Sequence, residues 1–176
     1  MTPPRNPTAT TSTSTDRAIA PEPIEPVRKA ITVNAPQAHA FQVFTDGIDR
    51  WWPREHHIGS SPMVRIFLEP HEGGRCYSTQ EDGTECDWGS VLAWEPPSRV
   101  VFAWQITTDW KFEKDLSKSS EVEMRFIPES STVTRVELEH RHLERHGAGA
   151  PGMRSAIDSP NGWGGMMRLY ATEAER

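Results

Sequence analysis

Histidines are the residues of this chain whose spacing points most directly to chemistry. His140 and His142 alternate with Arg141 in the segment ELEHRHL, where Val136 and Leu138 share their parity. Successive side chains of a strand point to opposite faces, so both imidazoles are expected on the apolar face. Histidine changes charge near neutral pH, which makes His140 a weak candidate for acid-base work or ligand contact. The alternative is a hydrogen-bonded core His140 and a solvated His142.

Tryptophans are the second group of residues that could bind a ligand. Trp51, Trp52, Trp104 and Trp163 are expected to pack in the core, or to line a cavity that would prefer flat or apolar ligands. The histidine pair at 56–57 has only the adjacent Glu55 as a possible co-ligand, and these residues do not make a metal-ligand set. We therefore predict a loop there and no metal.

Catalytic motifs with fixed spacing are missing from the sequence. It contains no nucleophile elbow, no phosphate-cradling glycine loop and no HExxH motif. General acid-base pairs need no contiguous motif, so enzymatic activity stays undecided, with a non-enzyme favoured. No cofactor is predicted.

Alternation of apolar residues predicts a sheet that would position these side chains. Val100, Phe102 and Trp104 share the more apolar face of one strand. Pro96 and Pro97 mark the preceding hairpin turn, because proline supplies no backbone N–H to a central ladder. Strands are expected at residues 27–35, 63–69, 75–80, 85–95, 98–106, 121–127 and 132–143, joined as an antiparallel meander.

Three helices are predicted beside the sheet. One begins at Pro36 and ends at Gly47, and a second short one carries an apolar i, i+3, i+4 set over 48–52. The residues after Gly147 form a connection rich in Gly, Ala and Pro. Asn161 then caps a C-terminal helix over 162–175. The fold class is therefore α+β with a helix-grip layout, in which a curved antiparallel sheet wraps around the C-terminal helix.

Two cysteines flank the turn at 82–83. If those two residues form the hairpin loop, Cys76 faces Gly89 and Cys86 faces Thr79, so the thiols would not pair. A different loop length would bring them opposite each other. Free thiols are predicted.

Length and net charge limit the possible number of domains and the possible partners. The 176 residues suit one core, and the net charge of −6 is opposite to that of most nucleic-acid binders. No apolar run approaches the roughly 20 residues that span a bilayer. We expect a cytoplasmic protein that has neither nucleic acid nor membrane as a partner.

The first 26 residues differ in composition from the rest. They are rich in Thr, Ser and Pro and have little apolar area to bury, so we predict a disordered tail at 1–26 before a domain at 27–176. Deleting the tail is then expected to leave the melting temperature nearly unchanged.

Several separated segments resemble one known family. The segments are FTDGIDRWWPREHHIG, GGRCYSTQEDGTECDWGSVLAWEPPSRVVFAWQI, TRVELEHRHLERHG and DSPNGWGGMMRLY. In this order they are similar to the START-like SRPBCC superfamily, and within it to bacterial proteins similar to the activator of heat-shock-protein ATPase. The resemblance covers about 27–174.

The resemblance implies a cavity between the sheet and the C-terminal helix, although a shared fold does not fix a function. The leading hypothesis is binding of a small apolar or aromatic ligand in this cavity. The alternatives are a chaperone-interacting module and an enzyme of the cyclase or hydrolase type. The side chains expected at the cavity are Trp51, Trp52, Phe102, Trp104, Met124, Phe126, His140, Trp163, Met167 and Tyr170.

Overall fold

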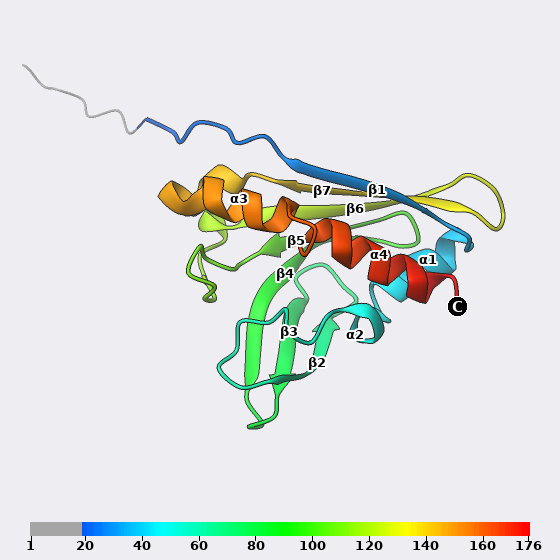
Figure 1. Ribbon diagram of the computed structural model, residues 1–176, viewed down its shortest axis with the longest axis horizontal. Coiled ribbons are helices and arrows are strands. Elements are labelled where there is room, and N and C mark those ends of the chain that lie inside the picture. The colour runs from blue at the N-terminus through cyan, green and yellow to red at the C-terminus, as the bar shows by residue number, and fades with distance from the viewer. Residues whose placement is uncertain (1–18) are drawn as a thin grey trace, which may run out of the picture.

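The structure is a computed structural model that describes residues 19–176. Its centre is a seven-stranded antiparallel sheet with the order β1-β7-β6-β5-β4-β3-β2 (Figure 1). The strands are β1 (Val27–Val33), β2 (Met63–Leu68), β3 (Arg75–Gln80), β4 (Glu85–Glu95), β5 (Arg99–Trp104), β6 (Ser120–Pro128) and β7 (Thr134–Arg141). Each predicted strand is present.

The helices lie on one side of this sheet. They are α1 (Gln37–Phe44), α2 (Ile48–Trp51), α3 (Ala150–Asp158) and α4 (Trp163–Ala174), with short 3-10 turns η1 (Leu116–Lys118) and η2 (Leu143–Gly149). Helix α4 packs against β1 and α1, and Figure 1 shows α3 and α4 following one another along the sheet. The predicted α+β helix-grip fold is confirmed.

Helix α3 is the element that the sequence analysis did not predict. The frequent Gly, Ala and Pro residues of this segment predict a connection instead. Pro151 lies within the first helical turn, where its missing N–H costs nothing, and Met153 and Ile157 form a one-sided buried stripe. Gly162 lets α4 follow closely, since a Cβ at this position would collide with the carbonyl of Ile157.

One half of the sheet is regular and the other half is curled. The pairings among β5, β6, β7 and β1 run without interruption, whereas each pairing from β2 to β5 contains a register shift. Bulges bend a strand and increase its twist. Strands β2 to β4 therefore turn away from the plane of the other strands (Figure 1), and the bulge in β4 lies at Trp88, between the pairs Cys76–Gly89 and Tyr77–Asp87.

The cysteines are both free, as predicted. Cys76 faces Gly89, but Cys86 faces Ser78 and not Thr79. The predicted two-residue loop is wrong: Gln80 N–H donates to Thr84 O, and Gly83 takes a φ of +82°, which gives a three-residue loop. The β4 bulge then restores the pairing of Cys76 with Gly89.

The predicted tail is only partly within the described residues, since residues 1–18 lie outside them. Residues 19–26 have no helix or strand, yet Ile24 packs against the core. Arg154 Nε donates to Glu25 O at 2.7 Å and its Nη2 donates to Pro26 O at 3.3 Å. The last residues of the tail therefore contact the domain.

Two truncations would measure this contact. Starting the chain at residue 27 rather than at residue 19 is expected to cost about 1 kcal/mol, from the buried Ile24 surface and the lost Arg154 bonds. Thermal unfolding should show a melting temperature lower by roughly 2–4 °C. Equal melting temperatures would show that these contacts contribute nothing.

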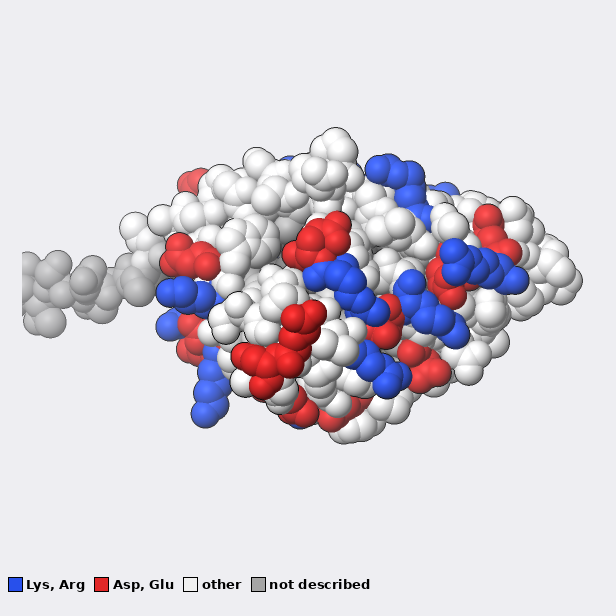
Figure 2. All heavy atoms as spheres, turned by 60° about the horizontal axis from the view of Figure 1, so that its bottom comes forward, with Lys and Arg blue, Asp and Glu red and all other residues white. Residues whose placement is uncertain are grey.

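Charges of both signs are interspersed over the face seen in Figure 2, with no broad area of one sign. Within residues 19–176, no helix has the length and apolar character needed to cross a membrane.

Candidate ligand-binding site

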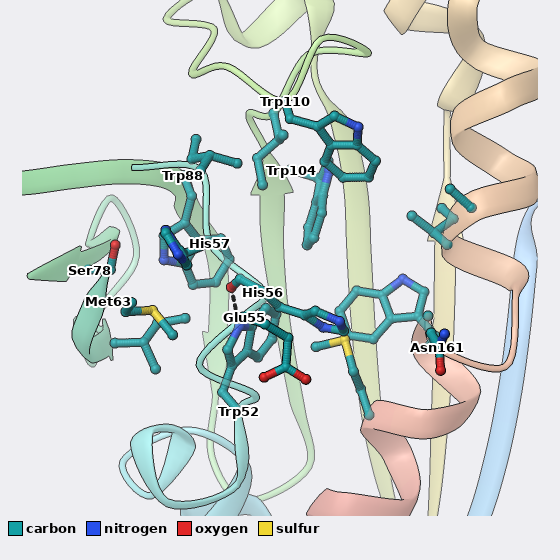
Figure 3. A pocket seen from close by; sticks show the side chains of 18 of the residues that line it. Trp52, Glu55, His56, His57, Met63, Ser78, Trp88, Trp104, Trp110 and Asn161 are labelled. Carbon is teal, nitrogen blue, oxygen red and sulfur yellow. Dashed lines mark hydrogen bonds between the residues drawn. The ribbon is translucent and has the colours of Figure 1, made fainter. Parts of the chain in front are cut away.

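A pocket of about 350 Å³ lies at the curled end of the sheet (Figure 3). Strands β2 to β5 form one wall, the loop after α2 forms a second, and the junction of α3 and α4 closes the third. Its aliphatic lining consists of Ile58, Met63, Ile66, Ile106, Ala156, Ile157 and Met166. The sheet bulges described above create this concave wall, because they curl only β2 to β5.

Four buried tryptophans surround the cavity, and we call them the tryptophan quartet: Trp52, Trp88, Trp104 and Trp163. Trp52 stacks on Trp88 with ring centroids 5.6 Å apart. Trp88 meets Trp104 at 6.2 Å, Trp104 meets Trp163 at 5.8 Å, and Trp163 meets Trp52 at 6.1 Å. The contacts close on themselves, so the quartet forms an aromatic wall held by mutual packing.

Polar side chains gather in the loop after α2. Glu55, His56 and His57 line the pocket, and Trp52 Nε1 donates to His56 O at 2.8 Å, which ties this loop to the quartet. Figure 3 shows these three side chains together, with Asn161 across from them. Among the lining residues, Glu55 is the only carboxylate, and no lysine or arginine is present. The pocket therefore suits a neutral ligand better than an anion.

Trp110 adds an exposed aromatic ring at the rim. It is 48% exposed, takes a φ of +59°, and stands in the turn that joins β5 to η1. A bulky residue with positive φ is uncommon and costs of order 1–3 kcal/mol of backbone strain. The rest of the structure must therefore hold Trp110 in this position above Trp104 (Figure 3).

A buried chain of hydrogen bonds runs behind the quartet. Trp163 Nε1 donates to His140 Nδ1 at 3.0 Å, so the neutral imidazole carries its proton on Nε2. This Nε2 donates to Ser120 Oγ at 2.6 Å, and the hydroxyl donates to His146 Nε2 at 2.8 Å. Ser120 N–H also donates to His146 Nε2, which agrees with that nitrogen being an acceptor.

These hydrogen bonds and the burial around them keep His140 neutral. Burial first, and then the neighbouring His146, lower the pKa of His140 from 6.5 to about 3. Burial also lowers the pKa of His146. His140 is therefore a neutral structural group that holds the Trp163 indole in the pocket wall, and not a side chain that reaches the cavity.

The pocket includes three of the ten side chains expected at the cavity: Trp52, Trp104 and Trp163. The other seven do not line it. They are buried elsewhere in the core: Trp51, Phe102, Met124, Phe126, His140, Met167 and Tyr170. His142, which shares the parity of His140, follows the end of β7 in a left-handed conformation and is partly solvated.

Aromatic packing explains why the cavity is confined to one end. Tyr170 meets Trp51 and Phe44 at 5.6 Å, and Phe44 meets Phe126 at 5.9 Å. Tyr170 Oη also donates to Ala40 O at 2.8 Å. These rings fill the space between α1, α4 and the regular half of the sheet, so the open volume remains at the junction of α3 and α4.

Sequence reasoning missed Trp88, Trp110 and the pocket position of the histidine pair at 56–57. Trp88 lies at a bulge, which strict alternation does not predict. The sequence predicts a loop at His56 and His57 but not that this loop lines the cavity. In residues 19–176, no group of three or more His, Cys, Asp or Glu side chains is placed to hold a metal ion.

Comparison with known proteins identifies related sequences and structures. The sequence model of the family described as Activator of Hsp90 ATPase homolog 1-like protein matches residues 34–168. A solved structure described as an anthrahydroquino-gamma-pyrone synthase, Txn09, complexed with SUM is 40% identical, with a TM-score of 0.62. The match covers 87% of this chain and 99% of that chain. No curated protein matches this chain.

Two further structures share the fold. CalC from Micromonospora echinospora, described as a self-sacrificing resistance protein, is 26% identical over 85% of this chain and 93% of its own, with a TM-score of 0.59. Protein NE0264 from Nitrosomonas europaea is 14% identical over 87% of this chain and 97% of its own, also with a TM-score of 0.59. The chain belongs to the family of Activator of Hsp90 ATPase homolog 1-like proteins, within the START-like SRPBCC fold.

Proposed function

We propose that this protein binds a flat, polycyclic aromatic molecule in the pocket bounded by the tryptophan quartet. The observation that carries the proposal is the closed set of four indole rings around a cavity of about 350 Å³. This volume is within the usual range of small-molecule sites, and stacked or edge-on aromatic contacts favour planar ligands. The 40% identity to a protein named for an anthrahydroquino-gamma-pyrone supports the same ligand class.

Fluorescence titration with 9,10-anthraquinone tests this proposal. The expected result is a saturable change in tryptophan emission, because the ligand would contact several indole rings. Two exposed neighbours on α3 provide a matched pair of variants, since Ala156 lines the pocket and Ser155 does not. Ala156→Phe should weaken binding at least tenfold, while Ser155→Phe should bind like the wild type. No saturable change in the wild type, or equal binding by both variants, would contradict the proposed site.

A second candidate function is enzymatic ring closure, favoured by the 40% identity to Txn09, which is named as a synthase. Addition of a ligand hydroxyl across a carbon–carbon multiple bond forms one C–O bond, breaks one π bond and moves the hydroxyl proton to the neighbouring carbon, so it needs no redox cofactor. His57 and His56 line the pocket and can carry such a proton. His140 is enclosed behind Trp163 and offers no such route.

The two functions differ in turnover. An enzyme should convert a hydroxyaryl ynone, which carries both reacting groups, and His57→Asn should reduce the rate much more than the affinity. A binding protein should bind this compound and leave it unchanged over the uncatalysed reaction.

Chaperone docking is a third hypothesis, and it depends on the family description alone. Purified Hsp90 should then show faster ATP hydrolysis when this protein is added. An unchanged rate together with ligand binding would favour the pocket as the functional site.

A further inference from the structure

Unpartnered polar atoms are concentrated at the pocket. Among the described residues, four buried side-chain atoms have no hydrogen-bond partner: His57 Nδ1, Gln80 Oε1, Trp88 Nε1 and Trp104 Nε1. Three belong to residues that line the pocket, and Gln80 donates to the hydroxyl of Ser78, which also lines it. Buried polar groups are nearly always paired in native proteins, so this clustering needs a physical explanation.

The five buried tryptophans allow an internal comparison of their indole N–H partners. Trp51 donates to Val43 O at 3.0 Å, Trp52 to His56 O at 2.8 Å, and Trp163 to His140 Nδ1 at 3.0 Å. The fold thus supplies an acceptor to every buried indole except those of Trp88 and Trp104, which are only 4% and 7% exposed. These two side chains come from neighbouring strands, β4 and β5, on the same pocket wall.

We propose that Trp88 and Trp104 are specificity residues whose indole N–H groups donate hydrogen bonds to oxygen atoms of the bound molecule. The inference rests on the proposed function and narrows its ligand class to aromatic compounds that carry carbonyl, quinone or ring-ether oxygens. An indole nitrogen donates and does not accept, so the ligand atom must be an acceptor. Glu55 at the same pocket and the lack of a lining lysine or arginine favour a neutral oxygen over a carboxylate.

Specificity follows from the hydrogen bonds that only a ligand with acceptor atoms can form. Both N–H groups are already buried and unpaired in the protein, so a hydrocarbon of the same shape would leave them unpaired, whereas a quinone would pair them. Sites that hydrogen-bond a ligand discriminate strongly against analogues that lack the polar atom. The apolar quartet alone would not distinguish the two compounds, because both present the same aromatic faces.

Equilibrium dialysis with 9,10-anthraquinone and anthracene tests the inference, since the two share a planar three-ring skeleton and differ in the two carbonyl oxygens. The wild type is expected to bind the quinone at least tenfold more tightly than the hydrocarbon. Trp104→Phe and Trp88→Phe keep an aromatic ring and remove the N–H. Each should weaken quinone binding roughly five- to tenfold, which corresponds to about 1–1.4 kcal/mol, and leave anthracene binding nearly unchanged.

The control variant is Trp94→Phe, because Trp94 packs on Phe41 and does not line the pocket. It should match the wild type with both compounds. Thermal unfolding of each variant checks the fold, and neither pocket variant loses a hydrogen bond within the protein.

The outcomes separate this inference from the proposed function. Equal affinity for both compounds, unchanged by either pocket variant, would overturn the inference alone and show that water or a neighbouring ring face satisfies the two donors. Failure of the wild type to bind either compound would overturn the proposed function and this inference with it. Selective loss of quinone binding in the pocket variants would support both.

Discussion

Replacing His140 with alanine is expected to lower the free energy of unfolding by about 4 kcal/mol at pH 7, from lost hydrogen bonds and a new cavity. The side chain is completely buried and bonds to Trp163 on one side and Ser120 on the other. Its removal leaves the indole N–H of Trp163 and the hydroxyl of Ser120 without these partners. Because Trp163 forms part of the pocket wall, ligand binding should weaken as well.

This loss should shrink in acid. The pKa of His140 is about 3 in the folded protein, against 6.5 for an unperturbed histidine, because of burial and the nearby His146. Between these values the unfolded chain binds a proton that the folded chain does not. The wild type therefore keeps this contribution above pH 6.5 and loses up to about 1.4 kcal/mol per pH unit below it. Alanine does not titrate, so the variant has no such slope from this position.

Urea unfolding at pH 7 and pH 5 measures both effects. The difference between wild type and His140→Ala is expected to fall by about 2 kcal/mol between these pH values. His39→Ala is the control, since the His39 side chain is exposed on α1 and forms no hydrogen bond within the described residues. A difference that does not change with pH would mean that His140 titrates normally in the folded protein.

The sequence contained most of the information about the fold. Alternation predicted the strands because each has one face on the core, as at Val100, Phe102 and Trp104. Gly and Pro placed the turns. Helix α3 was missed because its buried stripe, Met153 and Ile157, is short and lies in a segment of low helix propensity that only tertiary packing stabilises.

The candidate site could be predicted only in part, because a cavity is defined by what neighbouring side chains fail to fill. Parity correctly placed His140 on the inner face, yet parity does not reveal that Trp104 and Trp163 separate it from the cavity. The bulge at Trp88 breaks the period of two on which the strand argument depends. Only a prediction of the hairpin register that allowed for bulges would have placed Trp88 beside Trp104.

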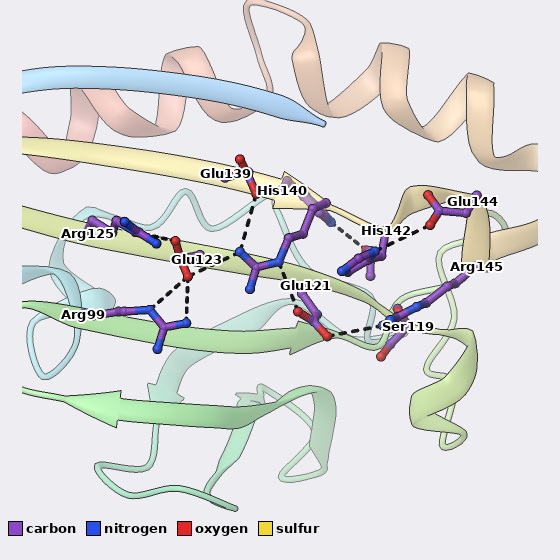
Figure 4. A network of polar contacts seen from close by, with 12 residues as sticks. Arg99, Ser119, Glu121, Glu123, Arg125, Glu139, His140, His142, Glu144 and Arg145 are labelled. Carbon is purple, nitrogen blue, oxygen red and sulfur yellow. Dashed lines mark hydrogen bonds and ion pairs between the residues drawn. The ribbon is translucent and has the colours of Figure 1, made fainter. Parts of the chain in front are cut away.

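On the opposite face of the sheet from His140, Glu123 on β6 is another buried polar residue. Its side chain is only 7% exposed, and it accepts hydrogen bonds from Arg99 and Arg125 (Figure 4). It also forms an ion pair with Arg141, with Nη1 and Oε2 3.3 Å apart. Arg99 lies on β5 and Arg141 on β7, so the carboxylate joins three adjacent strands. Burial acts to raise the pKa of Glu123, but the three guanidinium groups outweigh it and lower the pKa to about 2.

Replacing Glu123 with glutamine is expected to destabilise the protein by about 2–3 kcal/mol at pH 7, because three arginines lose their shared counter-charge. A carboxyl whose pKa is lowered in the folded state stabilises the protein above its unfolded pKa, which is 4.5 here. This contribution is lost as the pH falls from 4.5 toward 2. By pH 3, roughly half of the difference between wild type and variant should be gone.

Glu137→Gln on β7 is the matched control. Glu137 also bonds to an arginine, Arg135 at 2.8 Å, but both side chains are more than 40% exposed. Solvent and salt screen such a pair, so its loss should change the urea midpoint little at any pH. If the two variants lost equal stability, burial of the carboxylate would not be the source of the Glu123 effect. A larger and acid-sensitive loss at Glu123 alone would show that this carboxylate ties β5, β6 and β7 together on the outer face of the sheet.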